Sequence, residues 1–150
     1  MTPLPLKIIY ATPDEYRRHF ERVYCRGPII TFDGIPVWFR KQDFDHCMYE
    51  SSHRNRVKDV FSRDRAERID WIGSTLINPR AELYQGWDKK RHHIDSNYRV
   101  AVTYETFVVI IRVWLVGKGQ LKADFITAFL ADNSIGKIKA MPKWDKNKCR

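Results

Sequence analysis

Residues 98–130 read YRVAVTYETFVVIIRVWLVGKGQLKADFITAFL, and this stretch decides the fold. Apolar runs at 98–104, 107–116 and 121–130 are separated by the dipeptide Glu105-Thr106 and by the tetrapeptide 117–120. β-branched and aromatic residues dominate the runs, and short polar or glycine-bearing connections of this kind join neighbouring strands. The stretch therefore predicts an antiparallel meander of three strands.

Two helices are predicted ahead of this meander. Residues 12–15, Thr-Pro-Asp-Glu, combine an N-cap threonine, a proline at the first helical position and a capping-box glutamate. The helix that they begin should continue to about Cys25. A second helix should begin near Ser62 and end before Asn78-Pro79, because the residue before a proline disfavours helical backbone.

The remaining elements complete an α+β arrangement. A hairpin around Asp33-Gly34 is predicted from residues 29–32 and 35–39, and a further strand from Ala81–Gln85. We expect a single domain over residues 1–150, with a core of about 12–140 and a basic, solvated C-terminal tail over 141–150. Its antiparallel sheet should have about four to six strands, with the N-terminal helices packed on one face.

The strand register assigns the side chains of the meander to two faces. If Tyr104 pairs with Phe107 and Val116 pairs with Leu121, one face is apolar and can hold the helices. The other face then mixes polar and apolar residues, namely Arg99, Thr103, Arg112 and Thr127 with Ala101, Ile110, Trp114, Phe125 and Phe129. Cations that hold phosphates and rings that stack bases are what recognition of single-stranded RNA needs.

The charge of the chain also favours an anionic partner. The 27 Lys and Arg residues exceed the 18 Asp and Glu residues, which gives a formal net charge of +9 and a pI near 9.6. Lysines, arginines and two histidines crowd between His46 and Arg68, where their mutual repulsion costs stability unless an anion neutralises it. RNA is therefore the expected partner.

Other cellular contexts fit the sequence less well. The longest apolar run, 107–116, contains Arg112 and is too short to cross a bilayer as a helix, so no membrane association is expected. The first residues lack the pattern of a signal peptide. The three cysteines are scattered without a CxxC pair, which argues against a disulfide scaffold and against a four-cysteine zinc site. A reducing cytoplasm fits best.

Several polar residues are candidates for catalysis. His46 lies between Asp43 and Asp45 and could exchange protons near neutral pH, although a structural, hydrogen-bonded histidine is the more common case. Lys58 and Arg65 could stabilise charge on a phosphate. From the sheet, Arg112 and Thr127 could position that phosphate, although threonine is often present in strands only because it favours them.

Further basic residues are candidates for nucleic-acid contacts. The loop over residues 88–97 carries Lys89, Lys90 and Arg91, which could follow backbone phosphates. A metal site built from its histidines and aspartates is less favoured, because adjacent histidines rarely bind one ion. No metal or other cofactor is expected. The C-terminal basic residues begin at Lys137, and Arg68 either contacts RNA or forms a salt bridge on a solvated helix face.

The order of these features resembles phage-associated members of the barnase–EndoU–colicin–RelE nuclease group. The elements that match are His46 with Lys58, the helix start over 61–69, Trp71-Ile72 before Asn78-Pro79, and the strands with Val102-Thr103-Tyr104 and 125–129.

This resemblance, over roughly residues 30–140, implies metal-independent cleavage of RNA, with the site on an antiparallel sheet and the helices behind it. It carries over His46, Lys58, Arg65 and Thr127 as site residues. The chain departs from the pattern in its long N-terminal helix and in lacking a second catalytic histidine on the strands.

Three functional hypotheses follow. The first is a ribonuclease, a toxin with a possible protein antidote, in which the 2′-hydroxyl attacks the adjacent phosphorus while His46 acts as base or acid. The second is a non-catalytic nucleic-acid-binding or regulatory module that uses the same basic residues. The third is a protein-interaction domain for an acidic partner, with Trp71 as an exposed anchor.

Overall fold

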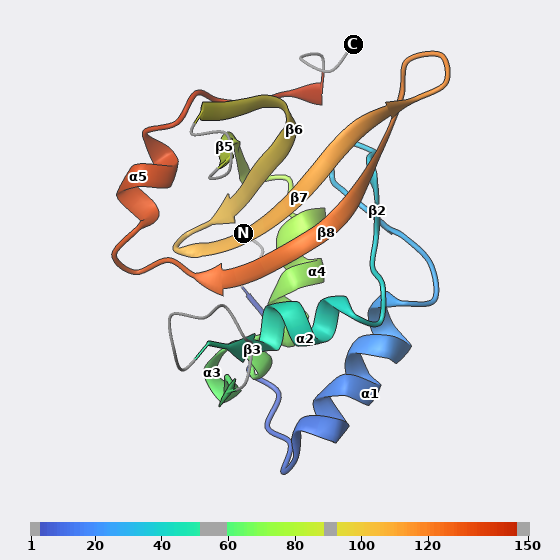
Figure 1. Ribbon diagram of the computed structural model, residues 1–150, viewed down its shortest axis with the longest axis vertical. Coiled ribbons are helices and arrows are strands. Elements are labelled where there is room, and N and C mark those ends of the chain that lie inside the picture. The colour runs from blue at the N-terminus through green and yellow to red at the C-terminus, as the bar shows by residue number, and fades with distance from the viewer. Residues whose placement is uncertain (1–3, 52–59, 89–92, 147–150) are drawn as a thin grey trace.

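The computed structural model describes residues 4–51, 60–88 and 93–146 of the chain (Figure 1). Its main feature is a six-stranded sheet in the order β1-β2-β8-β7-β6-β5, in which every neighbouring pair except one is antiparallel. The strands are β1 (Ile29–Ile30), β2 (Pro36–Trp38), β5 (Glu82–Asp88), β6 (His93–Tyr104), β7 (Phe107–Val116) and β8 (Gln120–Leu130). The α+β class and the predicted meander are confirmed.

The helices and a small second sheet complete the fold. A two-stranded sheet pairs β3 (Tyr49–Glu50) with β4 (Val60–Phe61). The helices are α1 (Pro13–Tyr24), α2 (Asp43–Met48), α3 (Arg63–Ala66), α4 (Ile69–Ile77) and α5 (Ile135–Lys139). Within the described residues, none of them is both long and apolar enough to cross a lipid bilayer.

The capping signals at the start of α1 act as the sequence predicts. The Thr12 hydroxyl accepts a hydrogen bond from the Glu15 amide at 3.3 Å, and Pro13 occupies the first turn. Tyr16, Phe20 and Tyr24 are buried on the inward side of the helix. The predicted second helix is instead interrupted between Ala66 and Ile69, so it forms α3 and α4.

The hydrophobic core lies between these helices and the face of the sheet that we call the inner face. Side chains of α1, α2 and α4 meet Val109, Ile111 and Val113 of β7 there (Figure 1). Phe20 packs edge-on against Phe39, with ring centroids 5.9 Å apart. This packing confirms that the N-terminal helices cover one face.

The register of β7 with β8 changes within the strand, and this corrects one prediction. Tyr104 faces Phe107 as expected, but Val116 faces Gln120 and not Leu121. A bulge places Ile110 opposite Thr127 and the next residue of β7 opposite Phe125. The extra residue moves Phe125 from the outer face to the inner one. Its side chain is fully buried, and its ring stacks on Phe39 at 4.7 Å.

Two features of the sheet were not predicted. The 29–38 hairpin, with Gly34 at φ 90, joins the meander because β2 runs parallel to β8, with Val37 opposite Ala123. Behind the meander, α5 and the segment after it cover part of the outer face. The indole of Trp144 is 4% exposed and its amide donates to the Leu83 carbonyl at 3.0 Å. Trp144 is thus anchored in the main core, whereas Lys143 and Asp145 beside it are exposed, so the solvated basic tail stays a prediction.

Candidate nucleic-acid interface

A row of polar residues crosses four strands on the outer face of the sheet. Arg99 of β6 lies opposite Arg112 of β7, which lies opposite Asp124 of β8, which lies opposite Trp38 of β2. Residues directly opposite one another share a face. Side chains along a strand point to the two faces in turn. Because Ile111 and Val113 point into the core, Arg112 between them points outward, and the residues opposite it do the same. Arg99 and Arg112 are thus brought together as the sequence predicts.

A lysine between two indole rings extends this row. Lys122 lies opposite Trp114, and its Nζ is 5.7 Å from the centroid of that ring and 5.9 Å from that of Trp38. Trp38 is 43% exposed. We call the six residues of this surface the outer platform: Trp38, Arg99, Arg112, Trp114, Lys122 and Asp124.

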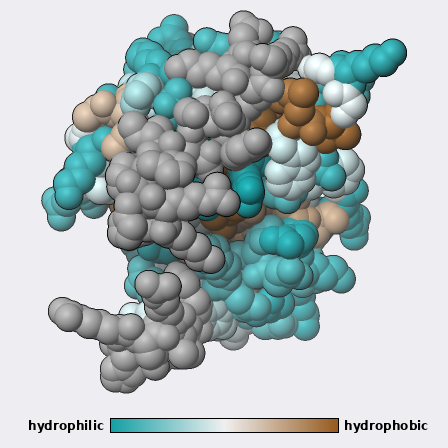
Figure 2. Space-filling view, turned by 45° about the horizontal axis from the view of Figure 1, so that its top comes forward, coloured by the Kyte–Doolittle hydropathy of each residue, from teal (hydrophilic) through white to brown (hydrophobic). Residues whose placement is uncertain are grey.

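An apolar side chain borders the outer platform toward the β7–β8 turn. Val116, two residues after Trp114 and so on the same face of β7, is 43% exposed. Figure 2 shows apolar surface beside hydrophilic surface on the side of the molecule where Figure 1 places this turn. The platform therefore combines three cations and two rings with one carboxylate and an apolar border.

The position of Arg99 depends on a glycine in the neighbouring strand. A Cβ atom added at Gly86 would lie 2.5 Å from Cγ of Arg99, which is closer than atoms of the two residues could approach. The stem of Arg99 therefore lies directly on the backbone of β5. Its Nε is buried and has no hydrogen-bond partner among the described residues.

The rest of the outer face is covered by the chain itself. A small buried cluster there contains Tyr84, Ala101 and Val108. Phe129 of β8 and Ile138 of α5 pack against this cluster. Thr103 is 1% exposed, and its hydroxyl donates to the Glu82 carbonyl at 3.2 Å. Thr103 is therefore too buried to contact nucleic acid as predicted, and its hydroxyl is already bonded to β5, the strand beside it.

The other residues predicted to contact nucleic acid lie in different environments. Arg68 is 8% exposed, its Nη1 donates at 2.7 Å to the Asp64 carboxylate and carbonyl, and its guanidinium lies 5.0 Å from the Trp71 ring. It is a packed cation, so its predicted RNA contact is wrong. Lys137 lies exposed on α5. The remaining predicted contacts lie outside the described residues: Lys89, Lys90 and Arg91.

Two of the predicted catalytic residues meet at Cys47 of α2. Arg65 donates to the Cys47 carbonyl at 3.2 Å, and the Thr127 hydroxyl hydrogen-bonds the sulfur. The thiol also donates to the Ala128 carbonyl at 3.6 Å. Burial raises the pKa of this thiol, and its hydrogen bonds with the Ala128 carbonyl and the Thr127 hydroxyl only partly oppose that rise. Cys47 is therefore a packing residue between α2 and β8.

His46 precedes this cysteine on the exposed side of α2. The carboxylates beside it have other contacts, because Asp45 pairs with Arg17 and Asp43 accepts from the Arg40 amide at 2.9 Å. Arg112 points away from α2, on the opposite face of the sheet. The predicted grouping of His46, Arg65, Arg112 and Thr127 in one cleft is therefore wrong, and Lys58 lies outside the described residues.

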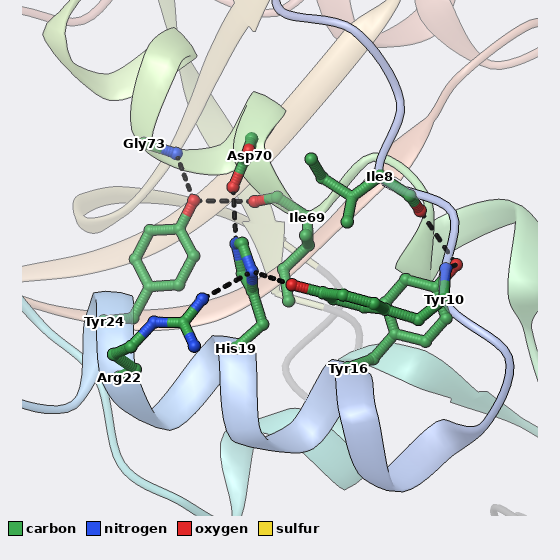
Figure 3. A network of polar contacts seen from close by, with 9 residues as sticks. All are labelled: Ile8, Tyr10, Tyr16, His19, Arg22, Tyr24, Ile69, Asp70 and Gly73. Atoms are coloured by element: carbon green, nitrogen blue, oxygen red, sulfur yellow. Dashed lines mark hydrogen bonds and ion pairs between the residues drawn. The ribbon is translucent and has the colours of Figure 1, made fainter.

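A second polar network lies between α1 and α4 (Figure 3). His19 Nε2 donates to Asp70 at 2.7 Å, and its Nδ1 lies 3.0 Å from the Tyr10 hydroxyl and 3.3 Å from Arg22. A neutral ring protonated at Nε2 satisfies all three contacts, because a carboxylate can only accept. Tyr24 donates to the Ile69 carbonyl at 2.6 Å. Because residues of α1 bond residues of α4 in this network, it stabilises the packing of the two helices.

Trp71 is not the exposed anchor that the helix pattern predicts. Its indole N–H donates to the Pro5 carbonyl at 2.7 Å, and its ring packs edge-on against Phe107 at 5.4 Å. The segment before α1 thus covers this tryptophan. The surface needed for the proposed protein-interaction anchor is occupied.

A small hollow lies beside the β1–β2 turn, between Thr31, Asp33 and Trp144. Apolar residues of the inner face form most of its wall, and it contains none of the predicted catalytic residues. Among the described parts of the chain, no three or more histidine, cysteine, aspartate or glutamate residues are grouped to hold a metal ion. The outer platform is therefore the surface with the clearest means of binding a ligand.

Sequence reasoning missed Trp38 and Lys122 as members of this platform. The alternation of Ile35, Val37 and Phe39 in the predicted hairpin already directs Trp38 outward, and this was the available signal. Comparison of the chain with protein-family models, curated proteins and solved structures gives no match.

Proposed function

We propose that the protein binds RNA through the outer platform. The observation that carries this proposal is the row in which Arg99 and Arg112 lie directly opposite each other, one strand from Lys122. Two guanidiniums side by side on one face can hold neighbouring phosphates of the same strand. Such contacts release counterions, which is the main source of RNA affinity.

The shape of the surface supports RNA as the polyanion. A sheet face with rings and cations suits a flexible strand, whereas reading duplex DNA commonly requires an element that enters the major groove. In addition, α5 covers the apolar half of the outer face, whereas Trp38 and Arg112 in the charged half are exposed among the described residues.

A matched pair of triple variants tests this proposal. Arg99→Ala/Arg112→Ala/Lys122→Ala removes the platform cations, and Arg18→Ala/Arg26→Ala/Lys41→Ala removes three exposed cations elsewhere. Both variants lower the formal charge from +9 to +6. With RNA titrated at several salt concentrations, we expect the platform variant to lose roughly 2 units of the slope of log K against log salt, since each phosphate contact contributes about 0.7.

The control variant should keep nearly the affinity and salt slope of the original protein. Equal losses in both variants would mean that RNA sees only the net charge and not the platform. No RNA binding by the unaltered protein at low salt would refute the proposal itself.

A ribonuclease is the second candidate, favoured by Arg65 and Thr127 meeting beside Cys47, one residue from His46. In this mechanism the 2′-hydroxyl loses its proton and attacks phosphorus, the P–O5′ bond breaks, and the leaving 5′-oxygen takes up a proton. His46 takes or gives one of these protons, solvent water exchanges the other, and Arg65 stabilises the growing charge. The likeness to the barnase–EndoU–colicin–RelE group is consistent with this chemistry.

The two candidates are separated by incubating labelled RNA with the protein in EDTA. A binding module retards the RNA and leaves it intact, whereas the nuclease cleaves it and loses cleavage in His46→Ala. Product that appears only with added metal would contradict the metal-independent mechanism.

A further inference from the structure

The outer platform has two tryptophan rings on either side of one lysine. Trp38, Lys122 and Trp114 come from three neighbouring strands, β2, β8 and β7. The ammonium group lies 5.9 Å and 5.7 Å from the two ring centroids. The rings are therefore no farther apart than the sum of these distances, with one positive charge between them.

These rings differ from the other tryptophans whose side chains the structure describes. Trp144 is buried in the main hydrophobic core, and Trp71 packs against that same core. Trp38 and Trp114 instead lie on the outer face, and Trp38 keeps 43% of its surface exposed. Exposing a large ring loses the stability gained by burying it, and a ligand that stacks on the ring would recover it.

We propose that this pair of rings stacks two bases of a single-stranded RNA while Lys122 holds a phosphate between them. The inference rests on the proposed RNA binding. It adds that the RNA is single-stranded and that the two rings distinguish it from a duplex. Both ring contacts of Lys122 lie near the outer limit for a cation–π interaction, so its ammonium can move from the rings to a phosphate at small cost.

The neighbours of the rings suit the same ligand. Arg112, two residues before Trp114 on β7, lies on the same face and extends the path of positive charge along the strand. Asp124 lies between Arg112 and Trp38 in the row. Its carboxylate repels phosphates but accepts hydrogen bonds from a base amino group, so it favours a base edge at this position.

Base stacking on a protein ring requires a base with an uncovered face. In a duplex both faces of each base are covered by neighbouring pairs, whereas an unpaired strand offers them. The two-ring arrangement therefore predicts preference for single strands. A duplex of the same sequence would contact only the cations.

The experiment measures affinity by fluorescence anisotropy with a labelled single-stranded RNA, its duplex, and competing inorganic polyphosphate. The proteins are the unaltered chain, Trp38→Ala, Trp114→Ala, Trp38→Phe and Trp114→Phe, each checked for folding by circular dichroism. We expect each alanine variant to bind the single strand roughly 5- to 150-fold more weakly. The phenylalanine variants should retain most of the affinity, and no variant should change the binding of polyphosphate.

The outcomes separate this inference from the proposal beneath it. If the unaltered protein binds RNA in a salt-dependent way, but the alanine variants bind like it and the duplex binds as well as the single strand, stacking is refuted and charge-based binding stands. If the unaltered protein binds no RNA, the proposed function fails first. Equal loss for the single strand and polyphosphate would assign the rings a role in shaping the surface, which also overturns the inference.

Discussion

The two halves of the outer face use the same strands but present opposite surfaces. Where β7 begins, Val108 is fully buried beneath α5 and its apolar neighbours. Further along the same face of the same strand, Arg112 and Trp114 belong to a charged surface that α5 does not cover. The comparison shows that α5 covers the apolar half of this face and does not cover the half with rings and cations.

The largest expected effect compares one substitution in both halves. Val108→Asp places a carboxylate where the side chain is fully buried, and we expect a loss of roughly 3–5 kcal/mol, as for an unpaired buried charge. Val116→Asp, on the same face of β7 but 43% exposed, should change stability by less than about 0.5 kcal/mol. Urea unfolding measures both, and similar losses would contradict the division into halves.

A second prediction compares a packed arginine with a platform arginine. Arg68→Ala removes hydrogen bonds to Asp64 and should cost roughly 1.5–3 kcal/mol of stability without changing RNA affinity. Arg112→Ala should do the reverse, with stability nearly constant and weaker RNA binding. Thermal unfolding and anisotropy titrations measure both quantities. A loss of RNA affinity in folded Arg68→Ala would extend the interface to α3.

A third prediction sharpens the role of β5 beneath the platform. Gly86→Ala brings a methyl group to 2.5 Å from the Arg99 stem, so one of the two must move. We expect a loss of about 1–2 kcal/mol, typical of modest overpacking. The double variant Gly86→Ala/Arg99→Ala should recover most of this loss in urea unfolding, because the clash is with the arginine. Additive losses would show that the backbone, not Arg99, is in conflict.

The smallest predicted effect concerns the inner face at alkaline pH. Burial raises the pKa of the Cys47 thiol from its ordinary value of 9.0, so the folded chain keeps a proton that the unfolded chain loses. Stability from this group is present below about pH 9, its ordinary pKa, and is lost as pH rises through the raised pKa of the folded state. Cys47→Ala should show a correspondingly shallower decline in urea unfolding measured from neutral to alkaline pH, and an unchanged decline would contradict this assignment.

The local elements were predictable because short-range chemistry specifies them. The capping box fixes the start of α1, and Glu105-Thr106 gives the turn that pairs Tyr104 with Phe107. These features depend on neighbours a few residues apart. Residue alternation then placed Arg99 and Arg112 on one face correctly.

The remaining features depend on contacts distant in sequence. One extra residue at Ile126 reverses the faces of half of β8, and no single residue type announces such a bulge. The pairing of Trp38 with Asp124 joins strands more than eighty residues apart. The sequence of α5 has no strong capping signal. Its position over the apolar half of the outer face therefore could not be predicted. These long-range effects explain why the candidate site was only half predicted.

The parallel pairing of β2 with β8 also affects the order in which the molecule can form during synthesis. Residues 36–38 leave the ribosome early, yet their only neighbour on that side is β8, at residues 120–130. The first hairpin must therefore wait, with one edge unsatisfied, until residues 120–130 have also emerged. Because Trp38 is placed by that later pairing, the two-ring surface cannot be completed before β8 is made.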